Sequence, residues 1–430
     1  MSITGLIKSK LKRMMDTGAF HITIGTFLTK FVAFFGSIVV VRILSKEDYG
    51  VMGYVENIYS YALIFAALGM SNAVLRYLVI AENEIEKKQY FQYIVQRSVI
   101  INFGISFLLV LVSQIMPIPE NFASARALIP ILALLLPFQD LLNDDLFTIR
   151  SFFKNKLYAY SALVSSVTLI VGRIVGAKVA GVDGVLWSRV IINLAFSVPL
   201  LVFVSKRFIV KESVIKLPQE KRRIVNSYSL QYMITNGFWA IFMLNDKFLL
   251  GMLLNDPVGL ADYNVASVLP GNIAIFATAI GTFVGPYFTK NEKNVEWIRR
   301  NYKKVAIISA GIVGAVALGI AVLARQLISL MYGEQYSNVV GLMRVMLIGA
   351  FINSGLRYVT ANVLAAMGEI KYNMIISGAG IGLQIIIDQI LIPTMGIMGV
   401  AISNCIVFLI MAVALFIVFH RKYYRETVQM

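Results

Sequence analysis

Charged side chains interrupt several of the most apolar stretches of this sequence. The run FWAIFMLNDKFLLGMLL, residues 238–254, holds Asp246 and Lys247 side by side. Because an ionised group is costly to place in hydrocarbon, such a residue usually faces a partner, a cavity or a substrate. Lysine and arginine can then neutralise an anion such as a phosphate, and a carboxylate can serve as a proton or sodium site. Other charges within apolar runs are Lys30, Glu56, Arg173, Arg357 and Asp388.

The composition indicates that these apolar runs are membrane spans. Of 430 residues, 58% are hydrophobic and 14% are charged, and the mean hydropathy is +0.76, whereas soluble domains are about half apolar and a quarter charged. A helix needs about 20 apolar residues to cross the hydrocarbon core. Four windows that lack Asp, Glu, Lys and Arg are long enough: 98–119, 224–245, 263–289 and 389–420. Such continuous runs argue against an outer-membrane barrel, whose short strands alternate.

The pattern predicts an all-α polytopic membrane protein with about twelve transmembrane helices. The expected spans are 18–43, 49–70, 92–115, 126–147, 157–177, 184–205, 228–252, 263–287, 304–325, 340–364, 372–392 and 397–419. Lysine and arginine concentrate in alternate connecting segments, so the positive-inside rule places both termini in the cytoplasm. This rule also accounts for most of the net charge of +16, so the charge does not indicate nucleic-acid binding.

An internal repeat divides the chain into two halves. The pattern GxxGVxxS occurs at 181–188 and again at 396–403, an offset of 215 residues. The same offset places Lys156 on Lys371 and Arg173 on Asp388. We therefore predict two six-helix bundles, residues 1–215 and 216–430, joined by a basic linker. An even number of spans per repeat gives the halves a parallel orientation, a plan that recurs in transporters with the substrate site between the repeats.

Several other classes of protein are disfavoured. Cys405 is the single cysteine, and His21 and His420 flank the first and last spans, so no metal site or other cofactor is expected. No GxxxxGK[ST] motif is present for direct use of ATP. The first 17 residues are basic and amphipathic and are interpreted as a cytoplasmic start rather than a signal peptide.

Three segments are similar to a known superfamily. They are VRILSKEDYG at 41–50, NDKFLLG at 245–251 with GLADYNVAS at 259–267, and IPTMGIMGVAIS at 392–403. They resemble the polysaccharide-exporter branch of the multidrug/oligosaccharidyl-lipid/polysaccharide flippase superfamily, and Wzx-type O-antigen or repeat-unit flippases match best. The resemblance implies transport of an undecaprenyl-pyrophosphate-linked oligosaccharide across the bacterial inner membrane. Spans 1–6 and 7–12 would form two bundles that face a central cavity and alternate between inward- and outward-open states. The resemblance also suggests the polysaccharide polymerase machinery as a partner.

The charged residues of the spans receive roles on this basis. In the family, spans 1 and 7 resemble each other and line the cavity, which makes Lys30, Lys247 and Asp246 the leading substrate-binding residues. Arg357, on a polar helical face, is a second candidate for binding the anion. Glu56, Arg173 and Asp388 are candidates for ion coupling or gating. Purely structural roles stay open: Asp246 could pair with Lys30, Arg173 could pair with Asp388, and Glu56 could be a capped interfacial carboxylate.

Two other functions compete with the flippase. A multidrug-type exporter of small cations, driven by an ion gradient, should have an acidic and aromatic cavity, whereas the charges within these spans are mostly basic. A membrane enzyme such as a polymerase or acyltransferase usually needs a large extramembrane loop or an evident His, Asp or Glu centre, and the longest loop here is near 205–228. The sequence therefore favours a transporter with an anionic substrate, and not an enzyme.

Overall fold

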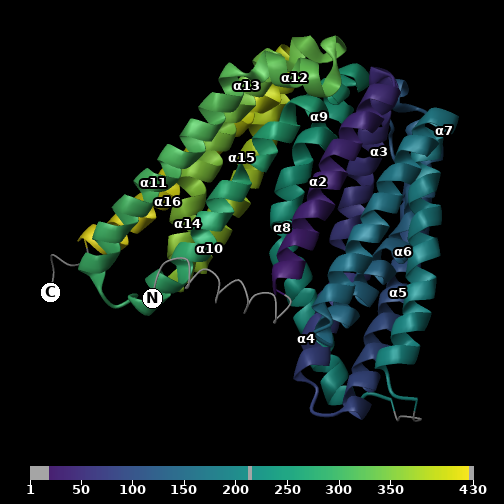
Figure 1. Cartoon of the computed structure of the whole chain (residues 1–430). Helices are drawn as coiled ribbons and strands as arrows, with labels where there is room; N and C mark the ends of the chain where they lie inside the picture. The colour runs from purple at the N-terminus through teal and green to yellow at the C-terminus, as the bar shows by residue number, and fades with distance from the viewer. Residues whose placement is uncertain (1–18, 212–215, 426–430) are drawn as a thin grey trace, which may run out of the picture. The chain divides into compact units, whose positions relative to one another are not determined.

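The computed structural model describes residues 19–211 and 216–425, and the regular elements in these two ranges are helices (Figure 1). Within these two ranges, eleven helical segments are long and apolar enough to cross a membrane. One of them, α7 (Asn155–Phe208), contains both the fifth and the sixth predicted spans. The prediction of an all-α chain with about twelve spans is therefore confirmed. The basic start at 1–17 and the side chain of His21 lie outside the described residues.

Contacts divide the chain into two compact units, Met1–Leu244 and Asn245–Met430, with the division inside helix α8 (Gln219–Leu254). The predicted boundary adjoins residues 212–215, which lie outside the described ranges, and the two six-helix halves stay a prediction. In the first unit, α7 packs along α2 (Ala19–Ile43) and α6 (Ala125–Ser151), and α6 packs along α5 (Glu84–Ile115). This unit also contains α3 (Lys46–Ile64), η1 (Ala66–Gly69), α4 (Met70–Ile80) and η2 (Glu120–Phe122).

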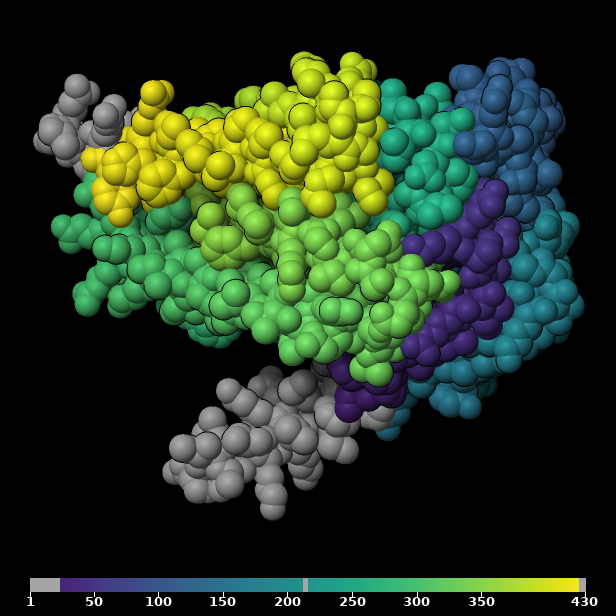
Figure 2. All heavy atoms as spheres, turned by 90° about the horizontal axis from the view of Figure 1, so that it is seen from above, coloured from purple at the N-terminus to yellow at the C-terminus, as the bar shows by residue number. Residues whose placement is uncertain are grey.

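The second unit is built around α16 (Ile397–His420), which contacts α15 (Ile370–Met395) and α13 (Val340–Ala350). Much of α16, yellow in Figure 2, lies on the surface shown there. The remaining helices are α9 (Pro257–Asn272), α10 (Ala274–Lys290), α11 (Val295–Val322), α12 (Ala324–Tyr332), η3 (Glu334–Val339), η4 (Phe351–Arg357), α14 (Tyr358–Ala366) and η5 (Arg421–Arg425).

Helix starts and breaks follow the local sequence. Ser45 caps α3 by accepting a hydrogen bond from the Asp48 amide at 3.0 Å, and Asn83 caps α5 in the same way, as expected for these residue types. The Pro270-Gly271 pair predicts a kink in the eighth span, and the structure breaks that span between α9 and α10. The second span is also interrupted, at η1, where Ala67 and Leu68 have positive φ.

The repeated glycine motif forms the same hairpin twice. Gly181 has φ 56° and ψ −132° inside α7, and Gly396 has φ 59° and ψ −139° between α15 and α16. Three residues later, a Cβ atom on Gly184 would overlap the carbonyl of Gly176, and one on Gly399 would overlap the carbonyl of Leu391. The two contacts are equivalent in the repeat, because Gly399 and Leu391 each lie 215 residues after Gly184 and Gly176. The repeat therefore encodes a sharp backbone reversal followed by a close approach of two helical limbs.

Replacing either reversal glycine with alanine should lower stability by a similar amount. Gly181→Ala and Gly396→Ala each force a Cβ into a backbone region that costs about 1–3 kcal/mol for residues other than glycine. Thermal unfolding of the purified protein in detergent measures this loss. Gly104→Ala and Gly378→Ala are matched controls, one per unit, because they lie within helices with no neighbouring atoms in reach. If both reversal variants unfolded at or above the temperatures of the controls, the positive-φ conformation assigned to Gly181 and Gly396 would be contradicted.

Candidate functional site

A partly buried ion cluster joins two helices of the first unit. Glu56 on α3 forms an ion pair with Arg189 of α7 at 2.7 Å, and Arg173, on the other limb of α7, lies 3.9 Å from the same carboxylate oxygen. The Arg189 and Arg173 side chains are 15% and 18% exposed, and that of Glu56 is 35% exposed. The single carboxylate therefore faces two guanidinium groups, and the cluster carries a net positive charge.

Arg189 and Arg173 share Glu56 as their ion-pair partner because α7 folds back on itself. The sequence leaves open a pair between Arg173 and Asp388, and the predicted span 184–205 places Arg189 near its start. In the structure the hairpin at Gly181 folds the second limb of α7 back, which brings Arg189 to Glu56 beside Arg173. Neighbouring Asn57 is also buried and donates a hydrogen bond to the carbonyl of Leu244 at 3.0 Å. These contacts fix the position of Glu56 on α3.

Asp246 is the centre of a polar network in the second unit. Its Oδ2 accepts hydrogen bonds from the Tyr263 hydroxyl and from Asn404 Nδ2, both at 2.6 Å. Its Oδ1 accepts from Gln384 Nε2 at 2.5 Å. The three donors come from α9, α16 and α15, so one carboxylate ties four helices together. Gln384 Nε2 also lies 3.0 Å from Asn404 Oδ1, which completes the network.

The other predicted residues of the second unit have different environments. Lys247, next to Asp246, is half-buried, and successive helical residues point in different directions. Asp388 is completely buried one turn beyond Gln384 on α15. Arg357 is also buried, in the π-helix η4, and it donates hydrogen bonds to Asn353 at 2.9 Å and to Ser377 at 3.0 Å. Binding of an anion by Arg357 stays a prediction.

Lys30 lies on α2 of the first unit with an exposed side chain. Each unit thus combines a fixed carboxylate, Glu56 or Asp246, with a lysine that is at least partly accessible. Among the described residues, no group of three or more His, Cys, Asp or Glu is placed to hold a metal ion.

A third polar cluster was missed by the sequence prediction. Asp140 of α6 accepts hydrogen bonds from Ser71 at 2.8 Å and from Asn102 at 2.6 Å. Asn102 in turn accepts from the Ala67 amide at 2.7 Å, so this cluster holds the break in the second span. Asp144 and Asp145 follow on the same helix and are completely buried. The signal was present in the sequence QDLLNDD, which places three carboxylates within one expected span.

The comparisons with known proteins agree with this architecture. A family model described as "Polysaccharide biosynthesis protein" matches residues 39–341. No curated protein matches the sequence. The lipid II flippase MurJ in its inward closed conformation has a TM-score of 0.72 at 16% identity, with 93% of this chain and 87% of that chain covered.

Two transporters of the MOP superfamily are also similar in structure. An inward-facing multidrug resistance transporter of the MATE family has a TM-score of 0.67 at 15% identity, covering 91% of this chain and 94% of that one. A transporter from Pyrococcus furiosus has a TM-score of 0.56 at 16% identity, covering 96% of each chain. At these identities the likeness establishes the fold. The family match extends over more than half of the sequence, and we conclude that the chain belongs to the polysaccharide biosynthesis protein family and has the fold of MurJ and the MATE transporters.

Proposed function

We propose that this protein is a flippase that moves an undecaprenyl-pyrophosphate-linked oligosaccharide repeat unit across the bacterial inner membrane by alternating access. The family match and the shared fold support a membrane transporter that acts in polysaccharide synthesis. The Wzx-type assignment, with O-antigen or a similar repeat unit as cargo, extends this to a specific substrate. Both termini lie in the cytoplasm in this proposal, and the polymerase machinery takes up the product.

The observation that carries the proposal is the placement of charge. The partly exposed carboxylate Glu56 already faces Arg189 and Arg173, and Asp246 accepts three hydrogen bonds in a buried position. Lys30 is exposed and Lys247 is half-buried. The accessible charge within these spans is therefore cationic, which suits a pyrophosphate with roughly two negative charges.

The named residues divide into two roles in this proposal. Lys30 and Lys247 contact the pyrophosphate, with Arg357 as a further candidate, while Asp246 fixes the segment that carries Lys247. Glu56, Arg173 and Asp388 act in gating or ion coupling, because each is a buried or half-buried charge that changes partners at a cost. The protein is a transporter in this account and catalyses no covalent reaction.

The alternative is a multidrug-type exporter of small molecules driven by an ion gradient, since MATE transporters share the fold. A cationic drug needs an accessible carboxylate, and the arginines beside Glu56 disfavour that reading. The two functions are distinguished with purified protein in liposomes. The flippase should move a fluorescent undecaprenyl-pyrophosphate oligosaccharide between leaflets, and a cationic dye should not compete. Transport of the dye without movement of the lipid would support the exporter.

Removing either accessible lysine should reduce transport. Lys30→Ala and Lys247→Ala each remove a charge-assisted contact to phosphate, which corresponds to an activity about 10- to 100-fold lower. Initial rates of lipid movement in the same liposomes provide the measurement, with protein abundance checked separately. Lys178→Ala, an exposed lysine of α7 near the Gly181 reversal, is the control and should keep full activity. Full activity of both test variants would contradict the proposal that Lys30 and Lys247 bind the pyrophosphate, and would leave them with structural roles.

A further inference from the structure

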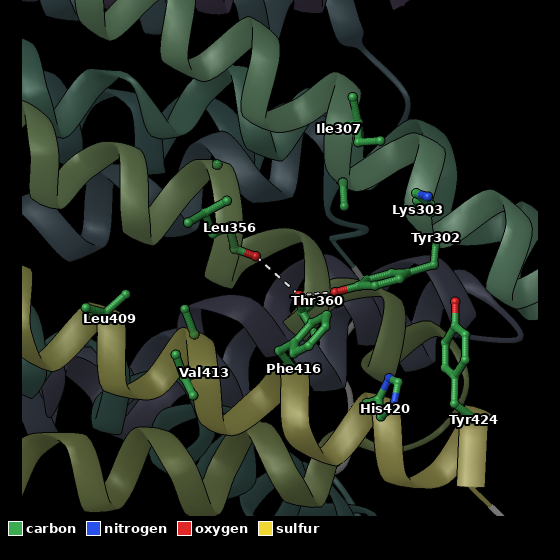
Figure 3. A pocket seen from close by; sticks show the side chains of 13 residues that line it. Tyr302, Lys303, Ile307, Leu356, Thr360, Leu409, Val413, Phe416, His420 and Tyr424 are labelled. Carbon is green, nitrogen blue, oxygen red and sulfur yellow. Dashed lines mark hydrogen bonds between the residues drawn. The ribbon is translucent and has the colours of Figure 1, made fainter.

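The second unit contains a cavity of about 570 Å³ that the proposed transport function does not use (Figure 3). It lies between α11 and α16, with η4 and the start of α14 contributing Leu356 and Thr360. Ile307, Leu409 and Val413 line it with exposed aliphatic side chains. In a membrane-spanning chain, such side chains face the hydrocarbon, so this cavity is accessible to lipid from the side.

A π-helical turn shapes the cavity wall. Residues Phe351–Arg357 form η4, where the helix is wider than an α-helix, and η4 packs against both α11 and α16. Such turns are rare and frequently occur at functional sites. Gly355 in this turn borders the cavity, and a side chain there would meet the Phe351 ring at 3.2 Å. Glycine at this position therefore lets the turn pack closely against the Phe351 ring, where a larger side chain would be crowded.

Two hydroxyl groups of the cavity wall are paired with each other. Tyr302 and Thr360 share a hydrogen bond of 2.8 Å between their hydroxyl groups, and Thr360 also donates to the Leu356 carbonyl at 3.2 Å. Figure 3 shows the aliphatic Leu409 and Val413 toward one end of the cavity, and Lys303, His420 and Tyr424 toward the other. A polar guest would find few partners at this part of the wall, because these two hydroxyl groups already bond to each other and to a carbonyl. The wall favours a hydrocarbon chain.

One end of the cavity is basic. Lys303 of α11 and His420, the last residue of α16, both border it and both are exposed. His420 stacks between Phe416, with ring centroids 6.0 Å apart, and Tyr424, at 4.7 Å, which fixes its ring at this edge. The residues that border the cavity include no aspartate or glutamate. A basic edge above an apolar slot matches a lipid with an anionic headgroup.

We propose that this cavity binds an anionic phospholipid, with one acyl chain between α11, η4 and α16 and its phosphate beside Lys303 and His420. A phosphodiester carries one negative charge, which one lysine and one histidine can satisfy. The pyrophosphate of a polyprenyl carrier carries more charge and would call for more cations. Neither Asp246 nor Lys247 lines this cavity, so its lipid is a bound component of the second unit rather than the transported cargo.

Photocrosslinking of the unmodified full chain tests the location directly. Phosphatidylglycerol with a photoreactive group in the middle of one acyl chain is added to the purified protein in nanodiscs, and labelled peptides are mapped by mass spectrometry. We expect labelling on α16 around Leu409 and Val413 and on α11 around Ile307, which excess unlabelled phosphatidylglycerol suppresses. Labelling spread evenly over the lipid-facing helices, or no suppression, would overturn the proposal.

Matched variants test the chemistry. Val413→Trp fills the cavity, whereas Ile410→Trp adds the same bulk to the same helix at a residue that does not line it; the two positions are 48% and 46% exposed. Native mass spectrometry should show phosphatidylglycerol binding lost only in Val413→Trp. Lys303→Ala should weaken binding about tenfold, the effect of one charge-assisted contact, and Lys304→Ala should not.

Three results would contradict the lipid assignment. Equal binding of phosphatidylglycerol and phosphatidylcholine would show that the basic edge does not contribute to binding. Equal losses in Lys303→Ala and Lys304→Ala would show only general attraction to the basic surface. Displacement of phosphatidylglycerol by an equimolar amount of undecaprenyl phosphate would show that a polyprenyl chain is the preferred occupant.

Discussion

Replacing Asp246 with alanine should abolish transport and lower the stability of the second unit by about 3 kcal/mol or more. The carboxylate accepts hydrogen bonds from Tyr263, Gln384 and Asn404 in a buried position. Alanine leaves these donors without their acceptor, and each unsatisfied buried polar group costs about 1–3 kcal/mol. Gln384 keeps its contact to Asn404, so the total should fall below the sum of the separate losses.

The effect of Asp246 can be measured in two steps. Unfolding of the purified protein in detergent gives the stability, and the initial rate of lipid movement in liposomes gives the activity. Asp246→Asn, with nearly the same shape, should retain part of the stability, because its amide oxygen still accepts while its NH₂ group meets one of the donors. Asp183→Ala, at an exposed position of α7, is the control. If Asp246→Ala kept wild-type stability and activity, the hydrogen-bond network around Asp246 would not be what holds this unit together.

Replacing Glu56 with alanine should be nearly as damaging in the first unit. Arg189 and Arg173, both mostly buried, would lose the carboxylate that neutralises them. Breaking a buried ion pair costs about 3–5 kcal/mol, and the partial exposure of Glu56 places the expected loss near the lower end of that range. Transport should fall too, because the two guanidinium groups would repel each other and move apart.

A double-mutant cycle separates this ion pair from general damage to the fold. Arg189→Ala should cost less than Glu56→Ala, since Arg173 remains near the carboxylate. The double variant Glu56→Ala/Arg189→Ala should recover part of the stability lost in Glu56→Ala, because one unpaired cation is removed with it. Glu120→Ala, an exposed carboxylate in η2, controls for loss of negative charge. Additive losses in the double variant would show that Glu56 and Arg189 do not interact.

The spans could be predicted from the sequence because hydrocarbon imposes a simple length and composition rule. The windows without charge, such as 389–420, correspond to parts of the observed helices, and the Gly181 and Gly396 repeats mark hairpins with nearly equal backbone angles. The merging of two spans into α7 was not foreseen. Its two limbs are joined by a single reversal at Ala180 and Gly181 with no intervening loop residues.

The site was predicted less completely because hydrogen-bond partners come from distant parts of the chain. Asp246 stands out in its apolar run, but Gln384 and Asn404 lie 138 and 158 residues away and are uncharged. Uncharged polar residues are common in spans, so neither one signals a contact. Arg189 could not be assigned to Glu56 without the hairpin that folds α7 back. Asp140 and its neighbours were detectable, since three carboxylates within one span are expensive wherever they lie.

The account is tested most directly by locating the lipid-linked oligosaccharide in cells that lack this protein. Leaflet-specific labelling of the sugar should show that the undecaprenyl-linked oligosaccharide accumulates on the cytoplasmic leaflet. The intact chain should relieve this accumulation, and Lys30→Ala and Lys247→Ala should relieve it poorly. If the oligosaccharide reaches the outer leaflet at the same rate with and without the protein, in cells with no second flippase, the proposed function is wrong.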